Sequence, residues 1–144
     1  MEHGERAEVT RKPDAIEIVT YGATQLPGFW PIVIRQGATL SIPFVWLDRD
    51  GKPVDLTGYT ARLKARTCAG GTVLLSLTSS DGITLGTTGG EITVGRSATA
   101  TAAYTFTRGV YDLELVDGSG VVKTLLEGAI RLDREATALS LIHI

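Results

Sequence analysis

The amino-acid sequence predicts an all-β fold, an antiparallel β-sandwich of the immunoglobulin-like or jelly-roll-like kind. The chain of 144 residues is rich in glycine (17) and threonine (19) and has a single methionine, a composition that favours strands and tight turns over helices. Apolar residues alternate with polar ones in several short runs, which is the pattern of half-buried strands. Turn signals return about every 8–12 residues, the spacing of sandwiches and small barrels.

The chain divides into an amino-terminal arm and one domain. Its length suits a single domain, which buries roughly 68% of its unfolded surface and needs no disulfide or metal. Residues 1–13 are polar without a hydrophobic period, and residues 21–31 are punctuated by glycine and proline. Between them lies one short apolar run at residues 16–19, a strand or part of the arm. We therefore expect an extended arm over residues 1–28 and a β-sandwich domain over residues 29–144.

The clearest strands lie early in the domain. Residues 40–46 alternate, with apolar side chains on one face. Pro43 cannot donate a ladder hydrogen bond, so this strand is expected at an edge or with a bulge. Residues 48–53 are dense in turn residues. Residues 59–66 then alternate most regularly of all, and their polar positions predict a solvated basic face.

Short elements joined by turns account for the remainder. Residues 97–103 are the one helix candidate, with Ser97 as the amino-terminal cap. The sequence DGSG at residues 117–120 predicts a hairpin turn. Further strands are expected at residues 73–77, 83–85, 92–94, 104–106, 111–115, 121–126 and 128–132, with a last strand or an exposed tail at 139–141.

Charge and composition argue against several classes of partner. The net charge is −2 and no run of basic residues forms a patch, so no nucleic acid is expected. No apolar stretch approaches the roughly 20 residues of a membrane-spanning helix, and the polar start is unlike a signal peptide. The single cysteine excludes an intramolecular disulfide and a cysteine-rich zinc site.

Few residues offer catalytic or metal chemistry. His3 and His143 stand at opposite ends of the chain, and Cys68 lies in a turn with no histidine near it in sequence. Asp48, Asp50 and Asp55 resemble a calcium loop, but the further ligand and the bidentate glutamate are missing. We interpret these residues as terminal histidines, an incidental thiol and turn residues.

The remaining polar and aromatic candidates also favour structural roles. The glycine-rich loop at residues 86–90 lacks a phosphate-binding pattern. Trp46 falls on an apolar strand face and is expected in the core, whereas Trp30 could contact a neighbour. The carboxylates, interpreted as the solvent face of a sheet rather than an acid/base pair, are Asp112, Glu114, Glu127, Asp133 and Glu135. No catalytic residue, metal ligand, cofactor or enzymatic activity is expected.

An ordered series of short motifs resembles a known group of proteins. The chain is similar to small structural proteins of tailed bacteriophages, including the amino-terminal domain of upper baseplate proteins. The resemblance covers residues 35–135. Its motifs are Arg35 to Thr39, Asp50-Gly51, Pro53 to Gly58, a strand ending at Arg66, Gly109 to Leu115, and Leu125 to Gly128 followed by Ile130 to Asp133.

This resemblance implies a virion protein, made in the bacterial host cytoplasm. It implies a repeated adaptor in the tail, baseplate or neck, whose partners are other virion proteins and copies of itself in a ring or other symmetric homo-oligomer. Upper baseplate proteins carry more chain after this domain than the present sequence does. That difference leads us to expect an adaptor or accessory role rather than binding to a host receptor. The alternatives are a capsid decoration or head-fibre protein and, from another class, a carbohydrate-binding β-sandwich.

The arm is the expected place of contact with partners. Edge-rich sandwiches bind neighbours by strand addition, and buried aromatic residues carry much of the energy of interfaces. We therefore expect residues 1–30 to become ordered on a neighbouring subunit. The anchors are expected to be Ile16, Ile18, Phe29, Trp30 and Ile32.

Overall fold

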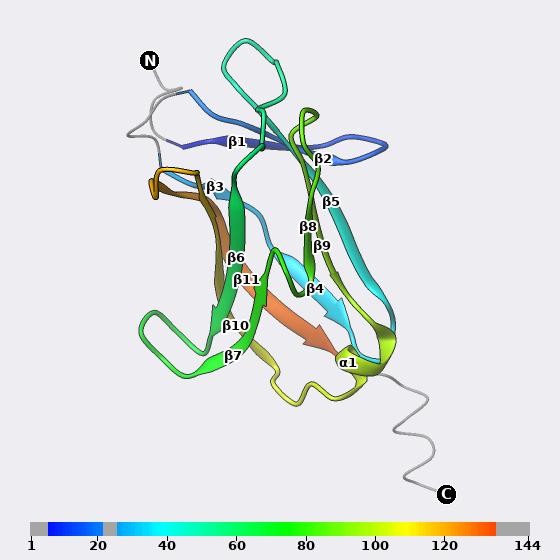
Figure 1. Ribbon diagram of the computed structural model, residues 1–144. Coiled ribbons are helices and arrows are strands. Elements are labelled where there is room, and N and C mark those ends of the chain that lie inside the picture. The colour runs from blue at the N-terminus through cyan, green and yellow to red at the C-terminus, as the bar shows by residue number, and fades with distance from the viewer. Residues whose placement is uncertain (1–5, 22–25, 135–144) are drawn as a thin grey trace, which may run out of the picture.

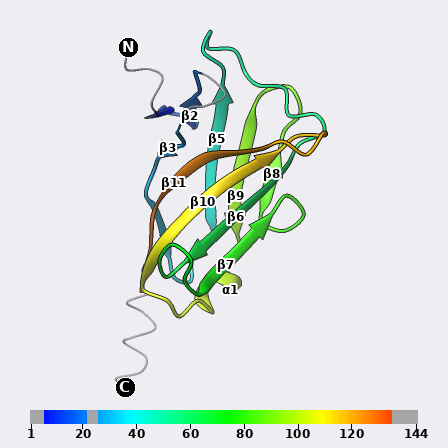
Figure 2. The same ribbon diagram turned by 90° about the vertical axis from the view of Figure 1, so that its left-hand side faces the viewer.

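Two β-sheets face each other across one hydrophobic core, so the predicted β-sandwich is confirmed (Figures 1 and 2). The computed structural model describes residues 6–21 and 26–134. The one helix within these ranges, α1 (Ala98–Ala102), has five residues. No helix of the described residues is long and apolar enough to cross a membrane.

The first sheet has five strands. Its spatial order is β1-β2-β5-β9-β8, with β5 at the centre. The strands are β1 (Glu8–Arg11), β2 (Ile16–Val19), β5 (Leu40–Leu47), β8 (Ile83–Leu85) and β9 (Glu91–Arg96).

The second sheet has six strands, and Figure 2 shows β11, β10, β6 and β7 side by side. Its order is β3-β11-β10-β6-β7, and β4 pairs with β11 further along the same edge as β3. The strands are β3 (Gly28–Phe29), β4 (Ile32–Arg35), β6 (Thr60–Arg66), β7 (Val73–Thr78), β10 (Arg108–Val116) and β11 (Val122–Asp133).

Most strand pairs are antiparallel, as expected, but both sheets are mixed. Strand β2 runs parallel to β5, and both β3 and β4 run parallel to β11. All three parallel pairings use strands from the first 35 residues. A parallel partner must come from a distant part of the chain, so no turn near these strands indicates the pairing.

The expected arm is, over its described part, built into the sandwich. Strands β1 and β2 form a hairpin in which Glu8 lies opposite Val19, and β2 joins the centre of the first sheet through Ile18, opposite Trp46. The Ala7 amide donates a backbone hydrogen bond to the Leu26 carbonyl at 3.0 Å, which ties this hairpin to the start of β3. An extended arm over residues 1–28 is therefore wrong for residues 6–21, because the alternation of Ile16 and Ile18 is that of an inward-facing strand.

The core between the sheets draws on nearly every strand. Trp46 is buried as predicted, and its indole Nε1 donates to Thr20 Oγ1 at 3.1 Å. The largest side chains with almost no exposure are Phe44, Ile18, Ile34, Leu63, Leu77, Ile92, Leu113, Leu115, Leu125, Leu126, Ile130 and Val94.

Strand β11 is continuous where two strands were expected. The ladder with β10 shifts by one residue, since Leu113 pairs with Leu126 while the next residue, Glu114, pairs with Thr124. This bulge leaves Leu125 outside the paired register. Leu125 and Leu126 are both fully buried, whereas a regular strand would turn one of two successive side chains to solvent.

The predictions for one helix cap, one proline and two short strands have different outcomes. Ser97 caps α1 as expected, accepting from the Ala100 amide at 3.2 Å. The edge or bulge expected at Pro43 is wrong, because β5 is the central strand and its ladder with β9 is regular there. Pro43 is accommodated because β2 begins its pairing only at Phe44. Residues 104–106 form no strand, although their aromatic side chains pack against the core, so alternation predicted their burial but not a ladder. The element expected at 139–141 lies outside the described residues.

Helix α1 is fastened to the turn that links β4 to β5. Thr101 is the one fully buried polar side chain among the described residues. Its hydroxyl donates to the Ala38 carbonyl at 2.8 Å and accepts from the Gly37 amide at 3.1 Å. A short threonine-rich helix is weak by itself, so this tertiary contact is what holds it in place.

Candidate interaction surface

The outer face of the six-stranded sheet carries charged residues in ordered rows. Basic side chains line β6, and the acidic residues of β10 lie beside them. In the register of the two strands, Arg62 lies opposite Glu114 and Lys64 opposite Asp112. On the other side of β10, Asp112 also lies opposite Glu127 of β11.

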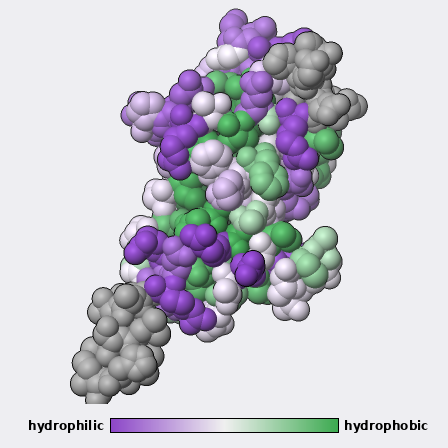
Figure 3. All heavy atoms as spheres, turned by 180° about the vertical axis from the view of Figure 1, so that it is seen from behind, coloured by the Kyte–Doolittle hydropathy of each residue, from purple (hydrophilic) through white to green (hydrophobic). Residues whose placement is uncertain are grey.

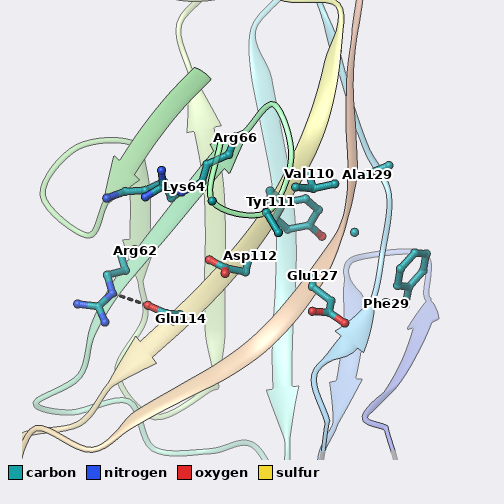
Figure 4. A pocket seen from close by; sticks show the side chains of 13 residues that line it. Phe29, Arg62, Lys64, Arg66, Val110, Tyr111, Asp112, Glu114, Glu127 and Ala129 are labelled. Atoms are coloured by element: carbon teal, nitrogen blue, oxygen red, sulfur yellow. Dashed lines mark hydrogen bonds and ion pairs between the residues drawn. The ribbon is translucent and has the colours of Figure 1, made fainter. Parts of the chain in front are cut away.

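These rows border a hollow of about 830 Å³ on the sheet surface. Figure 4 shows basic side chains of β6 on one side of it and Phe29 of β3 on the other, with Asp112 and Glu127 between them (Figure 4). Ala69 and Gly70, from the loop between β6 and β7, also border it. Much of the floor carries short side chains, because β10 and β11 present valine, aspartate, glycine and alanine there, with Glu114 and Glu127 beside them.

The charges of the hollow are only partly balanced within the chain. Arg62 and Glu114 form an ion pair at 2.6 Å, and Glu127 pairs with Arg6 at 3.0 Å. Asp112 forms no ion pair within the described part of the chain. Partial burial, followed by the nearby Glu114 and Glu127 carboxylates, raises the pKa of Asp112 above its ordinary value.

Apolar side chains are exposed on the same face. Among the described residues, seven large hydrophobic side chains are exposed, and five of these lie on outward positions of the six-stranded sheet. The view from behind, in which this face is turned to the side, also shows hydrophobic residues at the molecular surface among hydrophilic ones (Figure 3). The five on this sheet, with exposed fractions, are Phe29 at 59%, Val33 at 42%, Val73 at 43%, Val110 at 43% and Val122 at 47%.

The strand connection beside the hollow is held rigidly. Tyr111 of β10 is buried, and its hydroxyl donates to the Trp30 carbonyl at 2.5 Å. Burial raises the pKa of the Tyr111 hydroxyl far above its ordinary value, so it remains a donor. A side chain at Gly128 would overlap the Trp30 carbonyl oxygen, so glycine allows β11 to approach this connection.

The five predicted partner anchors are not brought together on one surface. Ile16, Ile18 and Ile32 are buried in the core of their own domain, so their assignment as anchors is wrong. Inward-facing strand residues and interface residues have the same apolar character in a sequence. Phe29 is exposed beside the hollow, whereas Trp30 is half-buried with the Arg11 guanidinium 5.3 Å from its ring centre.

The residues considered as calcium ligands or as a reactive thiol lie in turns and loops. The Asp48 carboxylate accepts from the amides of Asp50 and Lys52, and Asp55 accepts from Thr57. These oxygens organise their own loops, as Asx-turn residues do. Cys68 is an exposed thiol in the loop between β6 and β7. No group of three potential metal ligands occurs among the described residues.

The remaining candidate residues lie outside the described ranges, in a loop or on the outer sheet face. His3, His143 and Glu135 lie outside the described residues. The loop at residues 86–90 joins β8 to β9 and opens no helix. Asp112, Glu114 and Glu127 do lie on the outer face, as predicted, but their gathering beside a basic row was missed. Opposite charges at alternate positions of two strands signal such a surface only once their register is known.

Comparison with known proteins identifies a similar fold. No family description matches the sequence, and no curated protein matches it either. The N-terminal domain of ORF48 of phage TP901-1 aligns with a TM-score of 0.50 at 10% sequence identity, covering 90% of this chain and 98% of that one. Extracellular domains 3–5 of Drosophila OTK align with a TM-score of 0.33 at 14% identity, over 73% of this chain and 32% of that one. This second similarity is too low to support a conclusion. At the level of the fold, the predicted resemblance to an amino-terminal domain of a phage protein is confirmed.

Proposed function

We propose that this chain is a non-enzymatic structural protein of a tailed-phage virion, acting as a repeated adaptor in the tail, baseplate or neck. The fold shared with the N-terminal domain of phage TP901-1 ORF48, over nearly the whole of both chains, carries the proposal. The ordered sequence motifs over residues 35–135 support it independently, because they depend on the amino-acid sequence and not on the fold.

The outer face of the six-stranded sheet supports a role in assembly. Two exposed apolar side chains, Phe29 and Val110, border the hollow beside its charged residues, and protein interfaces combine apolar and polar groups in this way. The carboxylates there lie on an open sheet surface, and Glu114 is already paired with Arg62. This arrangement suits a docking surface better than an acid/base centre, which works best when water is excluded.

Copy number in the particle tests the proposal. Virions of the encoding phage are purified, and peptides of this chain are quantified by mass spectrometry against labelled standards, with the major capsid protein as internal reference. About six or twelve copies support an adaptor in the tail, baseplate or neck, where cyclic symmetry sets the number. Hundreds of copies would instead assign the chain to capsid decoration. Absence from particles, with a lysate of uninfected host as the blank, would refute a virion role.

The structure does not present Trp30 as a platform for a carbohydrate. A sugar ring stacks on an exposed aromatic face. Trp30 is half-buried, and Arg11 lies over its ring.

A further inference from the structure

The charged rows on the outer face are complementary to each other. Three cations stand on β6, and the acidic side chains stand on the adjacent strands β10 and β11 (Figure 4). Where it lines the hollow, the face is therefore divided along the strand direction into a positive side and a negative side; the outward residues Arg108 and Arg131 lie beyond this stretch. A surface of this kind is the electrostatic complement of a second copy of itself, provided that the copies are related by the right symmetry.

The shape of the face follows the same division. The β6 side chains Arg62, Lys64 and Arg66 are long and form a ridge. The neighbouring floor carries short side chains at Val110, Asp112 and Ala129, with two glutamates of β10 and β11 beside them. The hollow of about 830 Å³ lies over that floor, so the ridge of one copy fits the hollow of another.

Only one orientation of the twofold axis joins ridge to hollow. An axis in the plane of the sheet and perpendicular to the strands would place each β6 over the β6 of the other copy, with Lys64 facing Lys64. An axis parallel to the strands, midway between β6 and β10, places β6 over β10. Because Lys64 and Asp112 share one cross-strand position, each Lys64 then faces the Asp112 of the other copy.

The charges in that row have no internal partner that they would lose. Lys64 and Asp112 form no ion pair within the described residues, although they lie opposite each other in the sheet. Asp112 instead lies next to Glu127, a like charge directly across the strands, which is an unfavourable arrangement. An incoming lysine would offset it, and by symmetry the contact occurs twice.

We propose that the outer face of the six-stranded sheet is the interface between two copies of this chain, related by a twofold axis that runs parallel to the strands between β6 and β10. This deepens the proposed function, since it joins the repeated copies of an adaptor in pairs. The proposed interface rests on the register and charges of the sheet, and dimerisation is measured with purified protein in solution. A negative result there is therefore distinct from a failure to find the chain in virions.

The test uses two charge-reversed variants of the full chain, Lys64→Asp and Asp112→Lys, in analytical ultracentrifugation. We expect the wild type to sediment as a dimer of its 15.3 kDa chain. Each variant alone places like charges in contact twice and should be monomeric. In an equimolar mixture of the two variants, both contacts of a mixed dimer again join a lysine to an aspartate, so the mixture should dimerise. The matched control Lys52→Asp, in the exposed turn that follows β5 of the other sheet, should dimerise like the wild type.

Three results would overturn the proposal. The first is a wild type that remains monomeric up to about millimolar concentration, where even weak specific association is detectable. The second is a charge-reversed variant that dimerises as the wild type does. The third is a mixture in which the two monomeric variants fail to associate. Near-ultraviolet circular dichroism checks that each variant is folded. If a reversal unfolds the chain, the neutral variants Lys64→Gln and Asp112→Asn take its place. They are expected to raise the dimer Kd about tenfold or more, and an unchanged Kd would count against the interface.

Discussion

The strands of residues 6–35 and those of residues 40–133 are assembled differently. In the later region every described strand pair is antiparallel, and β6 with β7, β8 with β9 and β10 with β11 are neighbours in sequence as well as in space. In the earlier region only the β1–β2 hairpin has this character. Strands β2, β3 and β4 instead attach in parallel to β5 and β11.

The difference concerns distance along the chain. Contacts that fasten the early region are long-range: Tyr111 reaches Trp30 across 81 residues, and Thr101 reaches Ala38 across 63. Closing such loops costs entropy before any contact is gained. We therefore expect the antiparallel hairpins to form first and strands β1 to β4 to dock late.

The largest expected effects come from matched core truncations in the two regions. Ile18 on β2 and Ile92 on β9 flank the same strand, β5, and neither has measurable exposure. Changing either to alanine is expected to cost about 2–5 kcal/mol of unfolding free energy. In stopped-flow denaturant kinetics, Ile18→Ala should mainly speed unfolding, whereas Ile92→Ala should also slow folding.

The reverse kinetic pattern would show that the early region forms first. A loss well below 1 kcal/mol for Ile18→Ala, measured by urea unfolding beside Ile92→Ala, would mean that β2 is not packed as described. In that case the earlier expectation of a free arm would regain support.

A smaller effect is expected where α1 fastens the joint between the regions. Thr101→Val keeps the shape of the side chain but leaves the Ala38 carbonyl and the Gly37 amide without their partner. We expect a cost of about 1–3 kcal/mol, because unsatisfied buried polar groups are penalised. Thermal and urea unfolding measure it, and the exposed neighbour Thr99→Val is the control that should change little.

Tyr111→Phe sharpens the comparison further, because it removes one long-range hydrogen bond and little packing. The expected cost is about 1 kcal/mol, the net value of a typical intramolecular hydrogen bond. Hydrogen exchange should show faster opening of the Trp30 amide, which donates to the Glu127 carbonyl at 3.0 Å, while amides in β9 keep their protection. Equal acceleration in both places would contradict a separate attachment of the early region.

The smallest effect is expected within the antiparallel region itself, at the turn between β10 and β11. The Asp117 carboxylate accepts from the amides of Val121 and Ser119 and from the Ser119 hydroxyl, and these bonds lower its pKa. The folded state therefore binds this proton less readily than the unfolded chain, so the stabilisation is present at neutral pH and declines as pH falls through the depressed value. Asp117→Ala should destabilise the protein at pH 7 and progressively less in acid. A deficit that does not depend on pH would assign the effect to the turn backbone alone.

The same contrast explains how much could be predicted from the sequence. Strands β5, β6, β7 and β10 were located because alternation and nearby turn residues identify an antiparallel strand locally. Strand β4 was missed because its partner is 98 residues away in sequence, as the pairing of Ile32 with Ile130 shows. Only part of the candidate surface could be predicted. The basic face of β6 was predicted, but its placement beside Asp112 depends on a strand register that no short sequence pattern encodes.

The bulge in β11 has a consequence for how the gene for such a chain can vary. Leu113 pairs with Leu126 and Glu114 with Thr124, so removal of residue 125 would leave every described cross-strand pair intact. The loss would be one buried leucine rather than a reversal of faces along the strand. The ladder of β6 and β7 has a similar irregularity, since Ala65 pairs with Leu75 and Arg66 with Val73. Away from these two places a one-residue deletion would turn core residues to solvent. We therefore expect length changes within this sheet at residues 74 and 125, and sequence alignments of chains with this fold should place their gaps there.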